Sequence, residues 1–181
     1  AHAAPLAEAL VAGGLPVLEV TLRTPVALDA IRAMSAVPGG VVGAGTLLNP
    51  RDVKAAKAAG AKFGVSPGLT DELLAACEDE DLPLLAGTAT ISEAMRLLAR
   101  GYDVAKFFPA EVNGGVPALK AFHGPLPQMT YCPTGGISPG NAASYLALPN
   151  VLCVGGSWVV SKALMTGGEW GEIEQLARTA S

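Results

Sequence analysis

Histidine is almost absent from this sequence, and aromatic and charged residues are few. Among 181 residues there are two histidines, and 5% of residues are aromatic and 15% charged. His2 and His123 lie far apart in the sequence, so a metal site built on histidines would lack ligands, and we expect none. The net charge of −4 argues against nucleic acid or an anionic membrane surface as the main partner.

Long apolar runs and paired cysteines are also missing. No run approaches the ~18 residues of a membrane span, and residues 3–12 follow a helical pattern without the basic leader of a signal peptide. The three cysteines, Cys77, Cys132 and Cys153, form no Cys-x-x-Cys pair. We therefore expect small apolar core residues at all three positions, and a cytoplasmic protein with no membrane partner.

Glycine and proline are abundant instead, and they divide the chain into short apolar runs. The 22 glycines and 14 prolines lie between these runs and not in tracts, which is typical of frequent turns. Several runs are too continuously apolar to have one solvent-exposed face, as in the strands of a buried parallel sheet. We predict seven strands, over residues 16–22, 41–46, 62–66, 83–88, 104–110, 129–134 and 151–157.

Helix signals fill the segments between these runs. A helical pattern over residues 3–12 comes first, and the later helices are expected to start at capping residues that are followed by an apolar face. The predicted starts are Asn49-Pro50, Thr70, Thr90 with Glu93 in capping-box spacing, and Ser138-Pro139.

This alternation of helices with seven strands favours a closed (β/α)8 barrel (TIM barrel) of the α/β class. Such a barrel needs eight strands, each followed by a helix, so we expect the first strand upstream of Ala1 and treat residues 1–181 as a single domain. An open doubly wound sheet is the alternative, but the Gly-x-Gly-x-x-Gly turn of a dinucleotide site does not occur.

The first predicted strand alternates between apolar and polar side chains. Its even-numbered residues are apolar, whereas Glu19, Thr21 and Arg23 share the opposite face. We expect that face to point into the barrel, with Glu19 as a proton carrier and Arg23 as the group that binds an anionic carboxylate. A structural ion pair between Glu19 and Arg23 across Thr21 is the alternative.

Lys106 is a stronger candidate, because its near neighbours within residues 104–109 are apolar. An ordinary lysine is protonated at neutral pH, with a pKa near ~10.4. Desolvation in an apolar setting disfavours the ammonium form and makes the amine a nucleophile. The alternative is a structural lysine whose stem is buried while its amine reaches water.

Glycine-rich turns end the last two predicted strands, at Gly135-Gly136 and at Gly155-Gly156, which precedes Ser157. In (β/α)8 barrels the loops after strands seven and eight often bind phosphate through backbone N–H groups. These turns therefore favour a phosphate site, although tight turns alone also require glycine.

Six stretches of the chain resemble one enzyme family. They are LVAGGLPVLEVTLRT, VGAGTLLNP, SPGLT, KFFPAEVNGG, CPTGGIS and VLCVGGSW, and they run from residue 10 to residue 158 in the family's order. The family is 2-keto-3-deoxy-6-phosphogluconate (KDPG) aldolase, also described as 4-hydroxy-2-oxoglutarate (KHG) aldolase. The resemblance implies a class I aldolase of the Entner–Doudoroff pathway with a (β/α)8 barrel, assembled as a homotrimer.

The resemblance also implies roles for individual residues. Lys106 would form the Schiff base, and Glu19 would shuttle protons. The substrate-binding residues would be Arg23 and Thr46 at the pyruvate carboxylate, Pro67 beside the lysine, Phe108 near the aldehyde, Thr134 in the lining, and Gly135, Gly136, Gly156 and Ser157 at the phosphate.

The implied reaction cleaves a small phosphorylated keto sugar acid, 2-dehydro-3-deoxy-6-phosphogluconate, to pyruvate and glyceraldehyde 3-phosphate, with no metal and no organic cofactor. Three alternatives stay open: an aldolase for 4-hydroxy-2-oxoglutarate, one for a galactose-series 2-keto-3-deoxy sugar acid, and a non-catalytic barrel that binds a phosphorylated metabolite. The last would have no use for an amine isolated in an apolar strand.

Overall fold

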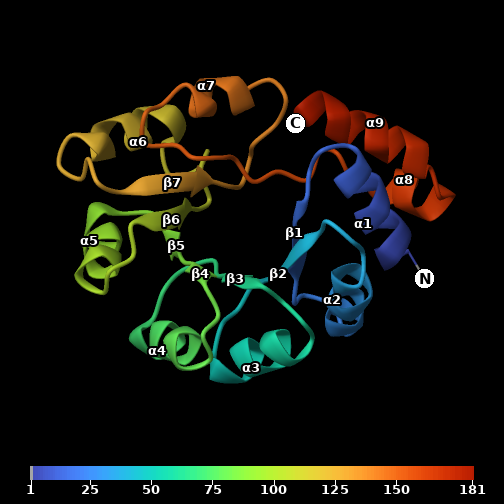
Figure 1. The fold of residues 1–181 in the computed structure, drawn as a ribbon. Helices are drawn as coiled ribbons and strands as arrows, with labels where there is room; N and C mark the ends of the chain where they lie inside the picture. The colour runs from blue at the N-terminus through green and yellow to red at the C-terminus, as the bar shows by residue number, and fades with distance from the viewer. Residues whose placement is uncertain (1) are drawn as a thin grey trace. The chain divides into compact units, whose positions relative to one another are not determined.

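Parallel strands alternate with helices along the chain, as predicted for the α/β class (Figure 1). The computed structural model describes residues 2–181. The chain divides into two compact units. Unit 1 comprises Ala1–Val65, Thr70–Leu84 and Ser157–Ser181, and unit 2 comprises Ser66–Leu69 and Leu85–Gly156. None of the helices within residues 2–181 is long and apolar enough to cross a membrane.

Unit 1 holds the first parallel sheet, apart from Leu85 at the end of its last strand. Its strands lie in the order β1 (Val17–Thr21), β2 (Val41–Gly45), β3 (Phe63–Val65) and β4 (Leu84–Leu85). Leu18 and Val42 are paired across β1 and β2 and are buried, and α2 lies against these two strands. The helices of this unit are α1 (Ala3–Ala12), α2 (Ala27–Ser35), α3 (Pro50–Ala58), α4 (Asp71–Asp79), α8 (Lys162–Gly167) and α9 (Trp170–Ala180).

Unit 2 holds the second parallel sheet, in the order β5 (Gly87–Thr88), β6 (Val104–Phe107) and β7 (Thr130–Pro133). The Phe122 ring of α6 contacts the rings of Phe107 on β6 and Tyr131 on β7, at 5.8 and 6.1 Å between centroids. These edge-on contacts fix α6 against the sheet. The helices of this unit are α5 (Ile91–Ala99), α6 (Gly115–His123) and α7 (Ala142–Leu146).

Three predicted helix starts are confirmed by their cap hydrogen bonds. Asn49 Oδ1 accepts from the backbone N–H of the third residue after it, at 3.1 Å, and Pro50 is the first residue of α3. The Thr70 hydroxyl caps α4 in the same way. Thr90 and Glu93 form the expected capping box at the start of α5. Caps need only neighbouring residues, which is why the sequence alone predicts them.

The fourth predicted start is wrong by a few residues. α7 begins at Ala142, not at Ser138-Pro139. The Ser138 N–H donates to Asn141 Oδ1 at 2.8 Å, and Asn141 Nδ2 donates to Gly136 O at 3.0 Å. Ser138 therefore belongs to a turn that the Asn141 amide holds in front of the helix.

Two predicted strands also differ from the structure. The segment 83–88 is interrupted at Ala86 and contributes β4 to the first sheet and β5 to the second. The segment 151–157 forms no named strand and makes only the isolated bridges Tyr131↔Val151 and Thr134↔Gly155. Between these bridges it has one residue more than β7 has, so a regular ladder cannot form, as at a β-bulge.

Two glycines of the first sheet lie under large side chains, those of Phe63 on β3 and of Leu47 after β2. A Cβ placed on Gly43 would lie 2.5 Å from Phe63 Cδ2, and one on Gly64 would overlap the Leu47 side chain. These distances are shorter than carbon atoms can approach, so both positions require glycine, the residue without a side chain.

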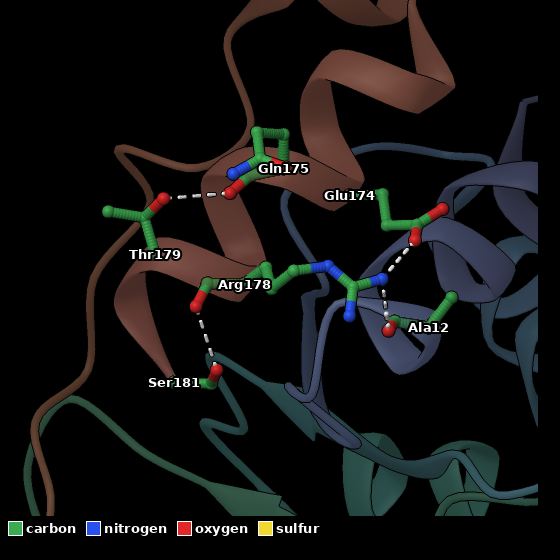
Figure 2. Close-up of polar contacts among 6 residues, drawn as sticks. All are labelled: Ala12, Glu174, Gln175, Arg178, Thr179 and Ser181. Carbon is green, nitrogen blue, oxygen red and sulfur yellow. Dashed lines mark hydrogen bonds and ion pairs between the residues drawn. The ribbon is translucent and has the colours of Figure 1, made fainter.

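In unit 1 the last helix packs on the end of the first (Figure 2). Gly13, directly after α1, permits this approach, because a Cβ there would lie 2.6 Å from Glu174 O of α9. Arg178 Nη2 donates to Ala12 O at 3.3 Å and pairs with the Glu174 carboxylate. A cation thus binds a carbonyl at the C-terminal end of α1, where the helix dipole favours positive charge.

Candidate active site

Lys106 is the buried lysine of this chain. It lies on β6 with 7% of its surface exposed. Its ring contact is with Phe108, two residues along, whose centroid lies 4.7 Å from Nζ. The other five lysines are all exposed: Lys54, Lys57, Lys62, Lys120 and Lys162. The predicted burial of this lysine within its strand is therefore confirmed.

The neighbouring strands surround Lys106 with backbone and small side chains. Gly87 of β5 and Cys132 of β7 are its partners in register. The Thr88 hydroxyl donates to Lys106 O at 3.1 Å and anchors the strand at this residue. A Cβ on Gly87 would overlap the carbonyl of Pro67, so Pro67 packs directly on the strand beside the lysine. Pro67 thus lies one strand away from Lys106.

The turn after β7 requires both of its glycines. Gly135 and Gly136 have φ values of +94° and +81°, in the region that side chains rarely adopt. Gly135 also packs closely on the loop after β6, since a Cβ there would lie 3.2 Å from Pro109 Cα and 3.3 Å from Phe108 Cδ2. Thr134 precedes the turn, and its N–H donates to Phe107 O at 2.9 Å. Thr134, the two glycines and Phe108 are therefore brought together within unit 2.

Gly156 and Ser157 are exposed and follow Gly155, the residue that bridges to Thr134. Gly156 ends unit 2 and Ser157 begins the last segment of unit 1. Their expected phosphate contact stays a prediction.

The remaining predicted site residues lie in unit 1. On β1 Glu19 is exposed and Leu18 before it is 5% exposed, whereas Val20 and Thr21 are both half-buried, so the predicted alternation is clear only at Leu18 and Glu19. Arg23 is also exposed, and its Nε donates to the Thr21 hydroxyl at 3.2 Å. Two points stay predictions: that this face lines a barrel interior, and that Glu19 acts together with Lys106.

Sequence reasoning missed the role of Gly45 on the neighbouring strand. A Cβ on Gly45 would lie 2.7 Å from Glu19 Cδ. The Glu19 carboxyl group therefore lies over Gly45, which pairs with Thr21 in register. Gly45 is the second glycine of VGAGT. The sequence alone does not show which strand lies beside it, and so does not show that this glycine makes room for Glu19.

Thr46 follows β2 in an unusual backbone conformation. Its φ of +62° lies in the left-handed region, where a β-branched residue is a genuine outlier. Such strain persists only where the surrounding structure enforces it, and it is often found at functional sites. Its position directly after Gly45 places Thr46 at the end of the strand that neighbours Glu19.

One cysteine differs from expectation. Cys77 and Cys132 are buried, as predicted, but Cys153 is exposed. The hydrogen bond from the Cys132 thiol lowers the pKa of Cys153 to about 7, against partial desolvation. The same hydrogen bond, followed by burial, raises the pKa of Cys132. Cys153 is thus an ionisable surface thiol and not a core residue.

No three metal-ligating side chains (histidine, cysteine, aspartate or glutamate) come together within residues 2–181. The groups described above offer a buried amine, a carboxylate on a strand face, an arginine and a tight glycine turn. A buried amine suits covalent chemistry on a carbonyl compound, and a carboxylate suits proton transfer.

Comparison with known proteins gives a consistent result. Residues 1–176 match the sequence profile of the KDPG and KHG aldolases. The KHG/KDPG aldolase of Escherichia coli K12 is 54% identical over 99% of this chain and 84% of its own length. The 2-dehydro-3-deoxy-phosphogluconate aldolase of Pseudomonas aeruginosa is 54% identical over 97% of this chain and 80% of its own.

A solved structure agrees in fold and sequence. The KDPG aldolase of Legionella pneumophila, crystallised with pyruvate captured at low pH as a covalent carbinolamine intermediate, superimposes with a TM-score of 0.96. It is 49% identical, and the match covers 99% of this chain and 88% of that one. The (β/α)8-barrel fold class predicted from the sequence is thereby confirmed, and the chain belongs to the KDPG and KHG aldolase family.

Proposed function

We propose that this protein is a class I aldolase that cleaves 2-dehydro-3-deoxy-6-phosphogluconate to pyruvate and glyceraldehyde 3-phosphate in the Entner–Doudoroff pathway. One observation carries the proposal: Lys106 is a buried lysine, 7% exposed, in the stretch KFFPAEVNGG that resembles the family. The Legionella pneumophila relative holds pyruvate as a covalent carbinolamine, and a carbinolamine requires an amine.

In the proposed reaction Lys106 Nζ attacks the C2 ketone, and loss of water from the carbinolamine gives an iminium ion. The electron pair of the C3–C4 bond then moves into the iminium and leaves an enamine. Glu19 accepts the proton of the C4 hydroxyl, directly or through water, as the aldehyde departs. Protonation of the enamine at C3 and hydrolysis release pyruvate. Proton transfer by a placed carboxylate is typically worth about 100- to 10,000-fold in rate.

Other side chains would bind the ends of the substrate. We propose that Arg23 and Thr46 bind the carboxylate, supported by the guanidinium that Thr21 holds on the exposed face of β1. Phe108 would shape the aldehyde end, supported by its contact with Lys106 Nζ. Pro67, packed beside the lysine strand, would help to place the amine. Thr134 would line the site.

The phosphate would bind the glycine turns. The residues proposed for this are Gly135, Gly136, Gly156 and Ser157. Support comes from the positive φ values of the first two, because a backbone without side chains can approach an anion closely and direct N–H groups at it.

The test is reduction of the protein in the presence of pyruvate. With borohydride, one three-carbon adduct should form per chain, and peptide mapping should place it on Lys106. Exposed lysines such as Lys62 are internal controls, because protonated amines form iminium ions poorly at neutral pH. Lys106→Ala and Lys106→Arg should both abolish the adduct and cleavage. An adduct elsewhere, or an active Lys106→Ala protein, would overturn the proposal.

A second substrate is supported by the Escherichia coli relative, which is named for both KHG and KDPG. We propose that 4-hydroxy-2-oxoglutarate is cleaved less efficiently, because it lacks the phosphate for the glycine turns. The comparison is kcat/KM for the two substrates. Equal values would remove the proposed role of those turns in specificity.

Assembly and location follow from the family resemblance. We propose a homotrimer in the cytoplasm. Large apolar side chains that remain exposed, among them Val26, Met95 and Leu146, support assembly, because such surface is commonly buried between subunits.

A further inference from the structure

A buried tyrosine and a carboxylate connect three segments of unit 2. Tyr145 of α7 is fully buried, and its hydroxyl donates to Glu111 Oε1. Burial, and next this hydrogen bond, raise the pKa of Tyr145, so it remains a donor at all physiological pH values. Glu111 follows β6, the strand of Lys106, five residues after the lysine. A hydrogen bond to a charged acceptor is among the stronger ones in proteins.

Glu111 also supports the glycine turn after β7. A Cβ on Gly136 would lie 2.5 Å from Glu111 Cγ and 2.8 Å from its Cβ, so the stem of Glu111 packs directly beneath Gly136. The Glu111 N–H donates to Gly135 O at 3.2 Å. On the other side of the turn, Asn141 Nδ2 donates to Gly136 O at 3.0 Å.

The turn is therefore held from both sides. On one side Glu111 holds it through its backbone and its stem. On the other side Asn141, directly before α7, holds it through its side-chain amide. Tyr145 of α7 reaches the turn only indirectly, by fixing Glu111. Glycine is flexible, so the Gly135-Gly136 turn needs such contacts to keep one conformation and direct its N–H groups.

We propose that Glu111, itself fixed by Tyr145, is a positioning residue that holds the Gly135-Gly136 turn in its phosphate-binding conformation. This rests on the proposed phosphate role of the turn. The consequence is a selective one: loss of the Tyr145 hydroxyl should loosen recognition of the phosphate while Schiff-base chemistry at Lys106 continues.

Tyr145→Phe tests this by removing a single oxygen atom. We expect KM for the 6-phosphorylated substrate to rise roughly tenfold, as for one lost hydrogen bond to a charged group. The kcat should stay within about twofold, and KM for 4-hydroxy-2-oxoglutarate should not change, because an ordering effect on the phosphate turn leaves the pyruvate end alone. Inorganic phosphate should inhibit the variant less than the parent.

Two further variants separate positioning from a general effect on folding. Tyr131→Phe is the matched control, since Tyr131 is equally buried in the same unit but its hydroxyl has no partner among the described residues; its KM values should equal those of the parent. Glu111→Gln keeps an acceptor oxygen for Tyr145 and should retain most of the affinity that Glu111→Ala loses.

The possible results are distinct. If Tyr145→Phe raises KM for both substrates equally, or for neither, the positioning role is overturned. If the parent itself shows no preference for the phosphorylated substrate, the proposed function of the turn fails first, and the positioning role fails with it. The proposal is supported if Tyr145→Phe raises KM for the phosphorylated substrate alone and if Glu111→Gln retains the affinity that Glu111→Ala loses.

Discussion

The left-handed conformation of Thr46, with φ of +62°, costs about 1–2 kcal/mol in a residue with a Cβ. Thr46→Gly should remove this strain, partly offset by the greater chain entropy of glycine. We therefore expect a free energy of unfolding within about 1 kcal/mol of the parent value, or above it. Activity should fall at least tenfold, because the hydroxyl proposed to bind the substrate carboxylate is lost.

Urea unfolding and steady-state kinetics measure the two effects. Asp81 offers the control, since it is exposed and also has a positive φ, +48°. Asp81→Gly should change stability in the same way and leave kcat/KM unchanged. Full activity in Thr46→Gly would contradict the proposed contact.

Cys153 should be the reactive thiol of the chain. Its pKa is lowered to about 7 by the hydrogen bond from Cys132, whereas burial, and next the charge of Glu78, raise the pKa of Cys77 to about 11. Because the thiolate reacts, the rate of alkylation of Cys153 by iodoacetamide should rise with pH to half its maximum near pH 7 and then level off. Cys77 should stay unmodified.

The variant Cys132→Ala removes the donor of that hydrogen bond. The pKa of Cys153 should then move up toward an ordinary thiol value of about 8.5, and the half-maximal alkylation rate should move to higher pH with it. An unshifted profile, followed by mass spectrometry of the labelled peptide, would contradict the hydrogen-bond explanation.

Single residues were predictable where the signal was local. A lysine within an apolar run indicates burial, and alternation along a strand indicates a face, so the burial of Lys106 and the exposed position of Glu19 were predictable from the sequence. The strain at Thr46, the space over Gly45 and the exposure of Cys153 depend on which segments lie alongside, and no local pattern reports them.

For helices and strands, too, features set by neighbouring residues were predictable and features set by distant segments were not. Helix starts at Asn49, Thr70 and Thr90 were predictable because each cap is made by neighbouring residues. The interruption of segment 83–88 at Ala86 was not, because it reflects pairing with two different sheets. Segment 151–157 has the composition of a strand, yet its extra residue opposite β7 leaves only two bridges.

The contact between α1 and α9 gives a prediction about stability. Gly13→Ala places a Cβ 2.6 Å from Glu174 O, so one helix must shift, at a cost of about 1–3 kcal/mol. Gly171→Ala in α9 is the matched control, since a Cβ there meets nothing within 4 Å, and alanine favours helix by up to about 1 kcal/mol. The melting temperature should fall in the first variant and hold or rise in the second.

For the whole molecule, the fold class was predictable because the alternation of buried strands and helices is repeated along the entire chain. That residues 1–181 act as one domain stays a prediction. So does the joint action of Glu19 and Lys106, which no local pattern can show.

The proposed homotrimer is tested at this scale. Light scattering after size exclusion should give a mass three times that of the 18.2 kDa chain, unchanged on dilution through the micromolar range. A mass equal to one or two chains would contradict the proposal. Borohydride trapping in the same sample should give three adducts per particle.

The glycines beneath bulky neighbours also determine how the sheet tolerates change. At Gly43 and Gly64 a larger residue is acceptable only if Phe63 or Leu47 becomes smaller at the same time, so these sites should show pairwise epistasis in a library of variants. Gly45 is different, because the side chain above it is the carboxylate of Glu19. The compensating change there removes the proposed proton carrier, so selection for activity should leave Gly45 without any tolerated replacement.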